Sequence, residues 1–106
     1  MKNEKAGSRT LRSIRRADIK KYQRRSELLA ALSNGTRLVI LDIILEYGEA
    51  CTCELEAALN VPQSTVTVHL HKLYEKGLLK KREEWKFTYY SMNRIHEKLI
   101  KTVLGK

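Results

Sequence analysis

The sequence predicts a mostly α-helical domain with one β-hairpin close to its C-terminal end. Two observations favour this fold class. Apolar residues recur at helical spacing before residue 78 and after residue 92, whereas short β-like runs occupy residues 78–82 and 87–92. A single proline also leaves long stretches free to be helical. The 106 residues are 42% hydrophobic, which suffices for one domain with a modest core.

The predicted helices share apolar residues three to four positions apart, and most of them end at asparagine or glycine. They cover residues 10–33, 36–47, 54–59, 64–75 and, after the hairpin, 93–104. Asn34-Gly35 separates the first two helices, and Gly48 and Gly77 end the second and the fourth. Residues 1–9 are expected to fray. The order of elements is therefore helix, helix, short helix, turn, helix, hairpin, helix.

A helix-turn-helix is predicted between Leu55 and Leu79, with its tight turn at residues 60–62. At about 100° per residue, Val66, Leu70 and Leu73 fall on one side of the fourth helix and are expected in the core. The opposite side could enter a DNA major groove. A solvated helix face usually carries lysine and glutamate, but residues 63–71 contain neither. We therefore favour a DNA-reading helix over an ordinary amphipathic surface helix.

The candidate DNA contacts are hydroxyl, amide, imidazole and methyl groups that can bond to or pack on base edges, together with nearby cationic side chains. They are Gln63, Ser64, Thr67, Val68, His71 and Lys72 on the helix, with Arg82 and Lys86 on the hairpin. The hairpin would then be a wing whose basic residues hold phosphates, although Glu83 and Glu84 at its tip would repel them. We expect Trp85 to cap the hairpin, a minor-groove or dimer contact being the alternative.

Positive charge is concentrated near the N-terminus. Residues 1–27 hold ten basic and three acidic residues, against 11 and nine in the remainder. A basic arm over residues 1–16 indicates a polyanionic partner, nucleic acid before anionic membrane, unless it is only a solubilising tail. Residues 17–106 would form the folded domain. The polar N-terminus resembles no secretory signal, and no long apolar run is present, so we expect a cytoplasmic protein with reduced cysteines.

The sequence resembles the arsenic-sensing ArsR/SmtB family of repressors over roughly residues 20–104. The segments that carry the resemblance are ALSNGTRLVILDIIL (31–45), EACTCELEAAL (49–59), PQSTVTVHLHKLYEKGLL (62–79) and KFTYYSM (86–92). Asn34-Gly35 departs from the family's usual Asp-Pro. The resemblance implies a winged helix-turn-helix homodimer that binds a palindromic operator and leaves it when an inducer binds.

The resemblance also implies that the first and last helices form the dimer interface. The apolar residues Ile95, Leu99 and Val103 repeat every four positions on the last helix, and Tyr22 belongs to the first. A monomer of this size would struggle to bury such a stripe, so we predict dimer contacts at these four residues. The alternative is that the stripe packs within its own chain.

Cys51-Thr52-Cys53-Glu54-Leu55 is close to the Cys-x-Cys-Asp-Leu motif with which arsenic sensors of this family bind their inducer. Soft thiolates select thiophilic ions such as arsenic(III), antimony(III) or cadmium. Residues i and i+2 lie about 200° apart on a regular helix, so we expect that one ion could hold both thiols only if the helix start unwound. A thiol redox switch and inert cysteines are the alternatives.

Other ligands are scarce. Trigonal arsenic(III) takes three sulfurs, but the chain has two cysteines. His96 and Glu97 alone are too few for the zinc site that some relatives build on the last helix, and His69 is expected to pack rather than bind metal. No cofactor is required by this interpretation.

Two other classes of protein are disfavoured. A small RNA-binding protein would need stacking positions on strands, and the only strands predicted form a hairpin. An enzyme would need a phosphate loop, a nucleophile paired with its base or a catalytic metal motif, and the sequence shows no Gly-rich phosphate loop and no HExxH-type motif. A Cys–His hydrolase stays an alternative because both residue types are present, but 106 residues leave little room for a substrate pocket. We therefore predict a sequence-specific regulator that binds double-stranded DNA.

Overall fold

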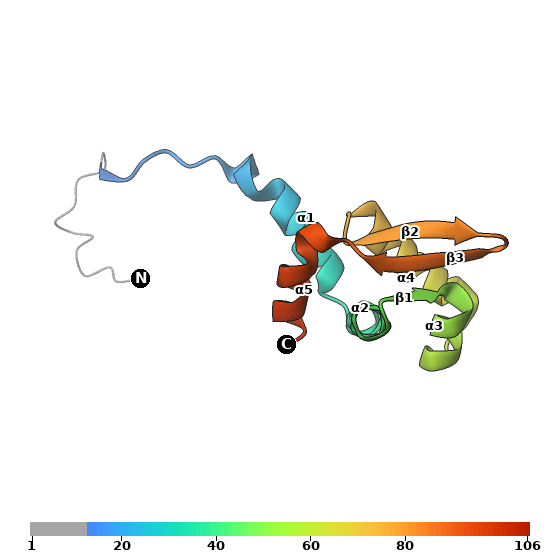
Figure 1. The fold of residues 1–106 in the computed structure, drawn as a ribbon. Helices are drawn as coiled ribbons and strands as arrows, with labels where there is room; N and C mark the ends of the chain where they lie inside the picture. The colour runs from blue at the N-terminus through green and yellow to red at the C-terminus, as the bar shows by residue number, and fades with distance from the viewer. Residues whose placement is uncertain (1–12) are drawn as a thin grey trace.

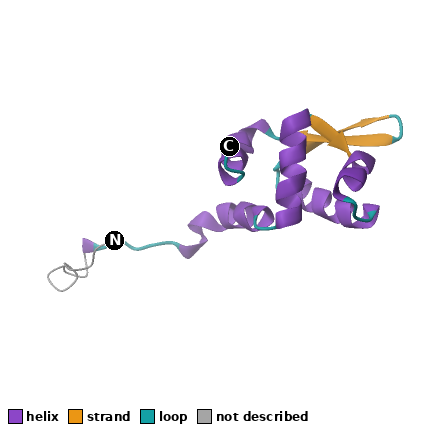
Figure 2. Cartoon of the chain, turned by 90° about the horizontal axis from the view of Figure 1, so that it is seen from below, coloured by secondary structure: helices purple, strands orange, loops and turns teal. Residues whose placement is uncertain are grey.

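The computed structural model describes residues 13–106, and its fold is a helical domain with a projecting hairpin (Figure 1). The helices and strands are α1 (Gln23–Leu32), α2 (Gly35–Tyr47), β1 (Glu49–Cys51), α3 (Thr52–Leu59), α4 (Gln63–Glu75), β2 (Leu79–Glu84), β3 (Phe87–Met92) and α5 (Glu97–Val103). Short 3-10 turns at Ile19–Tyr22 and Arg94–His96 precede α1 and α5. Helices make up most of the domain, and strands are confined to one side of it (Figure 2), which confirms the predicted fold class.

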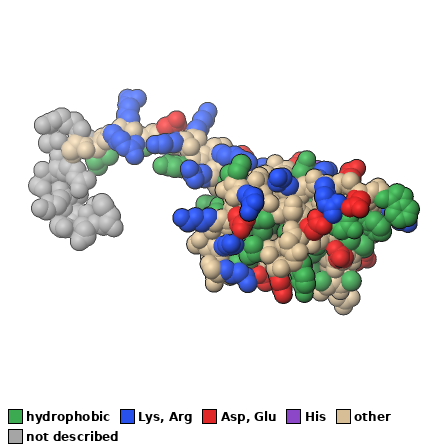
Figure 3. Space-filling view, viewed as in Figure 1, with side chains coloured by type: hydrophobic (Ala, Val, Ile, Leu, Met, Phe, Trp, Pro, Cys, Tyr) green, Lys and Arg blue, Asp and Glu red, His purple; other side chains and the backbone are tan. Residues whose placement is uncertain are grey.

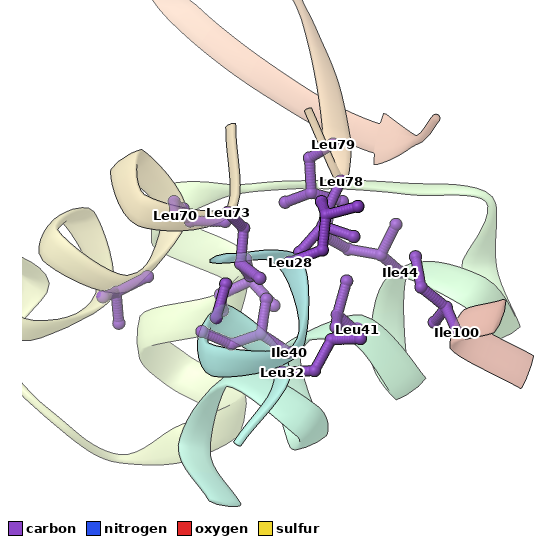
Figure 4. Packing of buried hydrophobic residues seen from close by; sticks show 14 residues of the cluster. Leu28, Leu32, Ile40, Leu41, Ile44, Leu70, Leu73, Leu78, Leu79 and Ile100 are labelled. Carbon is purple, nitrogen blue, oxygen red and sulfur yellow. The ribbon is translucent and has the colours of Figure 1, made fainter. Parts of the chain in front are cut away.

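One apolar cluster holds the domain together, and its buried side chains are drawn in Figure 4. Leu28 and Leu32 of α1, three residues of α2, and Ile100 of α5 meet the inner side of α4 there. Ile40, Leu41 and Ile44 of α2 are completely buried, so α2 is the helix around which the others pack. All buried side chains among the described residues are hydrophobic.

The sheet has three antiparallel strands in the order β1-β3-β2. β2 and β3 pair from Leu79 opposite Met92 to Glu84 opposite Phe87, which leaves Trp85 and Lys86 as a two-residue turn. Neighbouring residues of a strand face opposite sides of the sheet. Accordingly Tyr90 packs against the core, whereas the ring of Tyr89 lies beneath the Arg82 guanidinium.

The predicted first helix is wrong at its start. Residues 15–18 are not helical, a 3-10 turn begins at Ile19, and α1 begins only at Gln23; residues 10–12 lie outside the described part. Ile14 and Ile19 are 63% and 96% exposed. Because short helices need an apolar face packed on other elements, this basic segment has nothing to stabilise a helix.

Two boundaries near the cysteines also differ from prediction. Strand β1 was not predicted, and α3 begins at Thr52, two residues before the predicted start at residue 54. β1 is only three residues long and pairs with β3, which is distant in the sequence. Three residues are too few to show the alternation of apolar and polar side chains by which a strand is recognised in a sequence.

The apolar stripe predicted on the last helix divides between two environments. Ile95 and Val103 are 81% and 40% exposed, whereas Leu99 packs partly against the core beside the buried Ile100. In the described part of the chain, no single helix is long and apolar enough to cross a membrane; the pair Ile19–Leu32 and Gly35–Tyr47 passes that test together but is bent by 87°.

Candidate DNA-binding surface and cysteine site

Helix α4 has one buried side and one exposed side. Val66, Leu70 and Leu73 are fully buried, as their spacing predicted. The opposite side is exposed, with the Val68 side chain 62% accessible. The predicted base-contacting residues lie on the solvent side of one helix: Gln63, Ser64, Thr67, Val68, His71 and Lys72. His71 Nε2 lies 3.2 Å from Glu75 Oε2 along its C-terminal half.

The turn between α3 and α4 fixes the angle at which α4 leaves the body. Asn60 ends α3 in the left-handed conformation, with φ of 55°, and its N–H donates to Glu56 O at 2.9 Å. Asparagine tolerates this backbone better than most residues. Pro62 then precedes α4, and its carbonyl accepts from Thr65 N and Val66 N. The first turn of α4 is therefore capped by backbone alone.

Two arginines hold α4 against the rest of the domain. Arg37 of α2 donates through Nε to Ala31 O at 2.7 Å, and its Nη1 lies 3.2 Å from His69 Nδ1 on α4. Burial, and to a lesser extent the Arg37 charge, lowers the pKa of His69. The neutral ring can then accept a hydrogen bond from Arg37, which agrees with the prediction of a packed histidine. At the other end of α4, Arg24 Nη2 donates to Lys76 O at 2.8 Å.

On the wing, Arg82 and Lys86 have different surroundings. The Arg82 guanidinium donates to both carboxylate oxygens of Glu49, at 3.1 and 2.8 Å, and to Glu84 at 2.6 Å. These carboxylates raise the pKa of Arg82 above its ordinary value and compete with any phosphate for it. Lys86 has its ammonium 4.9 Å from the centre of the Trp85 ring. Lys86 is therefore the freer phosphate ligand of the two.

Trp85 does not cap the hairpin as predicted, because 86% of its surface is exposed. The sequence could not reveal this, since it gives no indication of which way a turn residue points.

Cys51 and Cys53 lie next to each other, with their sulfur atoms 3.1 Å apart. Cys51 is the N-cap of α3 and has an extended backbone, with φ of −95° and ψ of 167°. Its N–H donates to Glu54 Oε1 at 2.9 Å, which completes a capping box. Cys53 is on the first turn of α3. The expectation that the helix start must unwind is therefore wrong: Cys51 precedes the helix, so both thiols already face one point.

The two thiols differ in exposure and share a hollow with both candidate DNA-contacting elements. Cys51 is buried and Cys53 is exposed. Burial, followed by the hydrogen bond with Cys53, raises the pKa of Cys51. A cavity of about 250 Å³ is lined by Cys51, Thr52, Cys53, Gln63, Lys86, Phe87 and Thr88. Its wall thus includes the first residue of α4 and the residues at the tip end of the wing.

The winged helix-turn-helix geometry agrees with similarities to known proteins. The model of the bacterial regulatory protein, arsR family, matches residues 34–81. An uncharacterized HTH-type transcriptional regulator from Methanocaldococcus jannaschii is 37% identical over 87 residues, which are 80% of this chain and 97% of that protein. An arsenical resistance operon repressor from Staphylococcus aureus is 33% identical over 72 residues, or 68% of each chain.

The chain belongs to the ArsR family.

A solved ArsR-like structure has the same fold. The homodimeric winged helix-turn-helix DNA-binding domain of Mb0332 from Mycobacterium bovis, described as a possible ArsR-family transcriptional regulator, superposes with a TM-score of 0.74 at 27% identity and covers 85% of each chain. Membership in this family confirms the prediction of a DNA-binding transcriptional regulator rather than an enzyme.

Within this ArsR-family chain, the cysteine pair stands apart from other metal-binding side chains. Among residues 13–106, no group of three or more His, Cys, Asp and Glu side chains could hold a metal ion. The nearby Glu54 carboxylate is engaged in the capping box. Among the described residues, the side chains that meet at this point are thus the two thiols alone.

Several residues that position the surface were not predicted from the sequence. Arg24, Arg37 and Glu54 hold α4 and the start of α3 through contacts to the backbone or to a histidine. Only Glu54 carried a local signal, because it lies three residues after the N-cap, where a capping box places its acid.

Proposed function

We propose that this ArsR-family chain is a homodimeric repressor that reads a palindromic DNA operator with α4 and is released by a thiophilic ion at Cys51 and Cys53. One observation carries the DNA-binding part: the exposed side of α4 has hydroxyl, amide and methyl groups and no charge over residues 63–70. Such groups read base edges in the major groove. Lys72, Lys86 and, in competition with its carboxylates, Arg82 would neutralise phosphates.

The basic segment before α1 would add affinity without sequence preference. Arg15, Arg16, Lys20 and Lys21 are exposed, and residues 1–16 form the proposed arm. In a plot of log affinity against log salt concentration, removing that arm should make the negative slope shallower by about 0.9 for each phosphate contact that is lost. The sequence preference should stay the same.

The short distance between Cys51 and Cys53 supports the sensing part. Two thiolates sharing a tetrahedral ion at bonds of about 2.3 Å lie roughly 3.8 Å apart, so sulfurs now at 3.1 Å need to separate only slightly. Arsenic(III), antimony(III) and cadmium prefer such soft ligands. For arsenic(III) a third ligand would come from a small thiol, from water or from elsewhere in the dimer.

An ion at this pair would act on DNA binding through the shared cavity. Gln63 at the start of α4 and Lys86 on the wing both line the space beside the sulfurs. An ion bound between the two sulfurs would change the packing beneath α4 and the wing. The distance between α4 and the wing must match the grooves of the DNA, so such a change would disturb binding. DNA affinity would then fall without any unwinding of α3.

A thiol redox switch is the second candidate, and the same distance favours it. A disulfide has sulfurs about 2.05 Å apart, so the 3.1 Å separation would have to close by roughly 1 Å. Oxidation would remove the two thiols that an ion needs.

The deciding experiment is a titration of the reduced protein on a duplex that it selects from a random pool. Arsenite, antimonite, cadmium and peroxide are added separately. Release by an ion that is lost in both Cys51→Ser and Cys53→Ser, but kept in Thr52→Ser, supports ion sensing. Release by peroxide alone, reversed by dithiothreitol, supports the redox switch. Tight binding indifferent to all four reagents would reject both sensing proposals, and a pool with no enriched sequence would reject operator binding.

A further inference from the structure

The tip of the wing is formed by a residue with an unusual backbone. Trp85 is the first of two residues joining β2 to β3, and its φ is +60°. Positive φ at this position of a two-residue turn is usual for glycine, which lacks a Cβ, and unfavourable for a bulky side chain. A bulky aromatic at this place therefore costs stability, and an outlier of this kind suggests a functional use.

The side chains around Trp85 form an exposed aromatic and cationic tip. Trp85 makes an edge contact with Phe87, at 6.4 Å between ring centres, and Phe87 lies 6.4 Å from Tyr89. The Lys86 ammonium lies 4.9 Å from the Trp85 ring centre and 5.9 Å from that of Phe87. Figure 3 shows hydrophobic side chains at the far end of the hairpin with a basic side chain beside them.

The acidic residues of the wing oppose DNA less than their number indicates. Glu84 and Glu49 are both paired with Arg82, at 2.6 and 2.8 Å. Glu83 faces the other side of β2, because neighbouring strand residues alternate, and it shares that side with Lys81, whose ammonium lies 4.5 Å from the centre of the Tyr74 ring of α4. The charge in contact with the indole is that of Lys86, which complements a phosphate backbone.

The wing tip is close to the reading helix and far from the proposed dimer surface. Gln63 of α4 shares a cavity with Lys86 and Phe87. In Figure 1 the hairpin tip projects from the end of the domain opposite α1 and α5, and the turned view in Figure 2 shows the same arrangement. A second copy bound through α1 and α5 would leave the tip uncovered.

We infer that Trp85 is the wing's apolar contact with duplex DNA, its indole lying against the sugar and base edges of the minor groove beside the half-site read by α4. Lys86 neutralises the adjoining phosphate. Minor-groove binding proteins use apolar side chains in this way. This inference rests on the proposed operator binding and adds to it a residue that contacts DNA outside the major groove.

Trp85 is the only tryptophan of the chain, so its fluorescence reports on the wing tip alone. The full-length protein is titrated with its selected duplex, labelled with fluorescein so that anisotropy follows binding independently. We expect acrylamide quenching of Trp85 to fall at least twofold as anisotropy saturates. If the anisotropy saturates but the quenching of Trp85 does not change, the protein binds its duplex without the proposed wing contact, and this inference is overturned while operator binding stands. If the anisotropy does not change at all, both proposals are overturned.

Two variants separate this contact from a structural role. Trp85→Gly relieves the strained backbone, so its melting temperature should rise while its DNA affinity falls about fivefold or more, as expected when an aromatic contact to a nucleotide is lost. Its salt dependence should not change, whereas Lys86→Gln should reduce the slope by about one phosphate. Undiminished affinity in Trp85→Gly, or a loss explained by a weaker dimer in sedimentation, would overturn the inference.

Discussion

The two cysteines are unequal in their chemistry. Cys51 is buried at the N-cap of α3 and Cys53 is exposed one residue inside the helix. Burial raises the pKa of Cys51, and the hydrogen bond with Cys53 adds to the effect. A thiolate, not a thiol, is the metal ligand. An ion that binds both sulfurs must therefore displace protons, one of them from a group that holds its proton more tightly than an ordinary cysteine.

Cadmium affinity should accordingly rise with pH. Below the pKa values of both thiols, binding one ion to two sulfurs releases two protons, so the association constant should increase about a hundredfold per pH unit. Because the pKa of Cys51 is raised, the release of its proton, and with it a rise of affinity with pH, should continue above the ordinary cysteine value. The charge-transfer absorbance of cadmium thiolate, read in competition with a chelator, measures it. Cys53→Ser should bind cadmium more weakly, and its association constant should rise less steeply with pH. A tenfold rise per unit in the unaltered protein would contradict a two-sulfur site.

His69 gives the domain an acid-sensitive contact. Its lowered pKa means that the folded state binds this proton less readily than the unfolded chain does. The contribution of His69 is complete above the unfolded value of 6.5 and is lost as pH falls toward the lowered folded value. The melting temperature should therefore decline as the pH falls below about 6.5, and the decline should be shallower in His69→Gln. His71→Gln, on the exposed side of α4, is the control. Equal slopes in the wild type and His69→Gln would contradict the assignment.

At the scale of single residues, spacing alone predicted the buried and exposed sides of α4. The same reasoning found the cysteine pair but not its geometry, because residue 51 was assumed to follow helical rotation and instead caps the helix. The contacts of Arg24 with Lys76 and of Arg37 with His69 join residues 52 and 32 positions apart. No local pattern encodes such pairs.

Among the elements, α4 depends on a tight junction at its C-terminal end. Gly77 follows the helix with φ of +78°, and Leu78 N donates back to Leu73 O at 2.9 Å. This is a Schellman ending, which favours glycine. A Cβ on Gly77 would also lie 3.2 Å from Arg24 Nη2, the atom that bonds to Lys76 O. The backbone at residues 76–78 therefore ends α4, leads directly into β2 and accepts the hydrogen bond by which Arg24 attaches α1.

Gly77→Ala should destabilise the domain by about 1–2 kcal/mol, the cost of a left-handed backbone for a residue with a Cβ. Chemical denaturation followed by circular dichroism measures it. Gly35→Ala is the matched control, because Gly35 lies in α2 without positive φ and a Cβ there meets no atom within 4 Å. That variant should be neutral or slightly more stable. Equal losses in the two variants would show that the backbone conformation at Gly77 does not matter.

Element boundaries were predictable where a glycine, an asparagine or a proline ended a periodic run, as at both ends of α2. Element boundaries were not predictable where contacts with distant parts of the chain decide whether a helix or strand forms. The helix expected from residue 10 fails because Ile14 and Ile19 have nothing to pack against. Strand β1 exists because β3 is present to pair with it. Both outcomes depend on tertiary contacts that a local pattern does not contain.

At the scale of the whole molecule, the candidate surfaces lie at opposite ends. The wing tip projects at one end, and α1 with α5 lies at the other (Figure 1). Some of the exposed apolar side chains lie on the terminal segments: Tyr22 is 58%, Leu29 is 53% and Ile95 is 81% exposed. The dimer role of the first and last helices follows from the family resemblance and stays a prediction, and the spacing of the last stripe did not reveal which of its residues would turn inward.

Dimerisation through the terminal helices should be sensitive to a charge at Ile95. This side chain is 81% exposed in the single chain, so Ile95→Glu removes little intramolecular packing and should leave the melting temperature of the monomer nearly unchanged. Buried in an interface between copies, the same carboxylate would be desolvated without a partner. Sedimentation equilibrium should then show a dimer weakened at least tenfold. Thr102→Glu, which places the same charge at an exposed polar position of α5, should retain the dimer.

The loss of the dimer has a separate consequence on DNA. A dimer gains affinity from two half-sites about one helical turn apart, whereas a monomer reads each independently. Ile95→Glu should therefore bind a duplex with two half-sites hardly better than one with a single half-site, while the preferred half-site sequence, read by α4, stays the same. If Ile95→Glu stays dimeric and keeps its preference for paired half-sites, the two copies must associate through a surface other than the one that Ile95 belongs to.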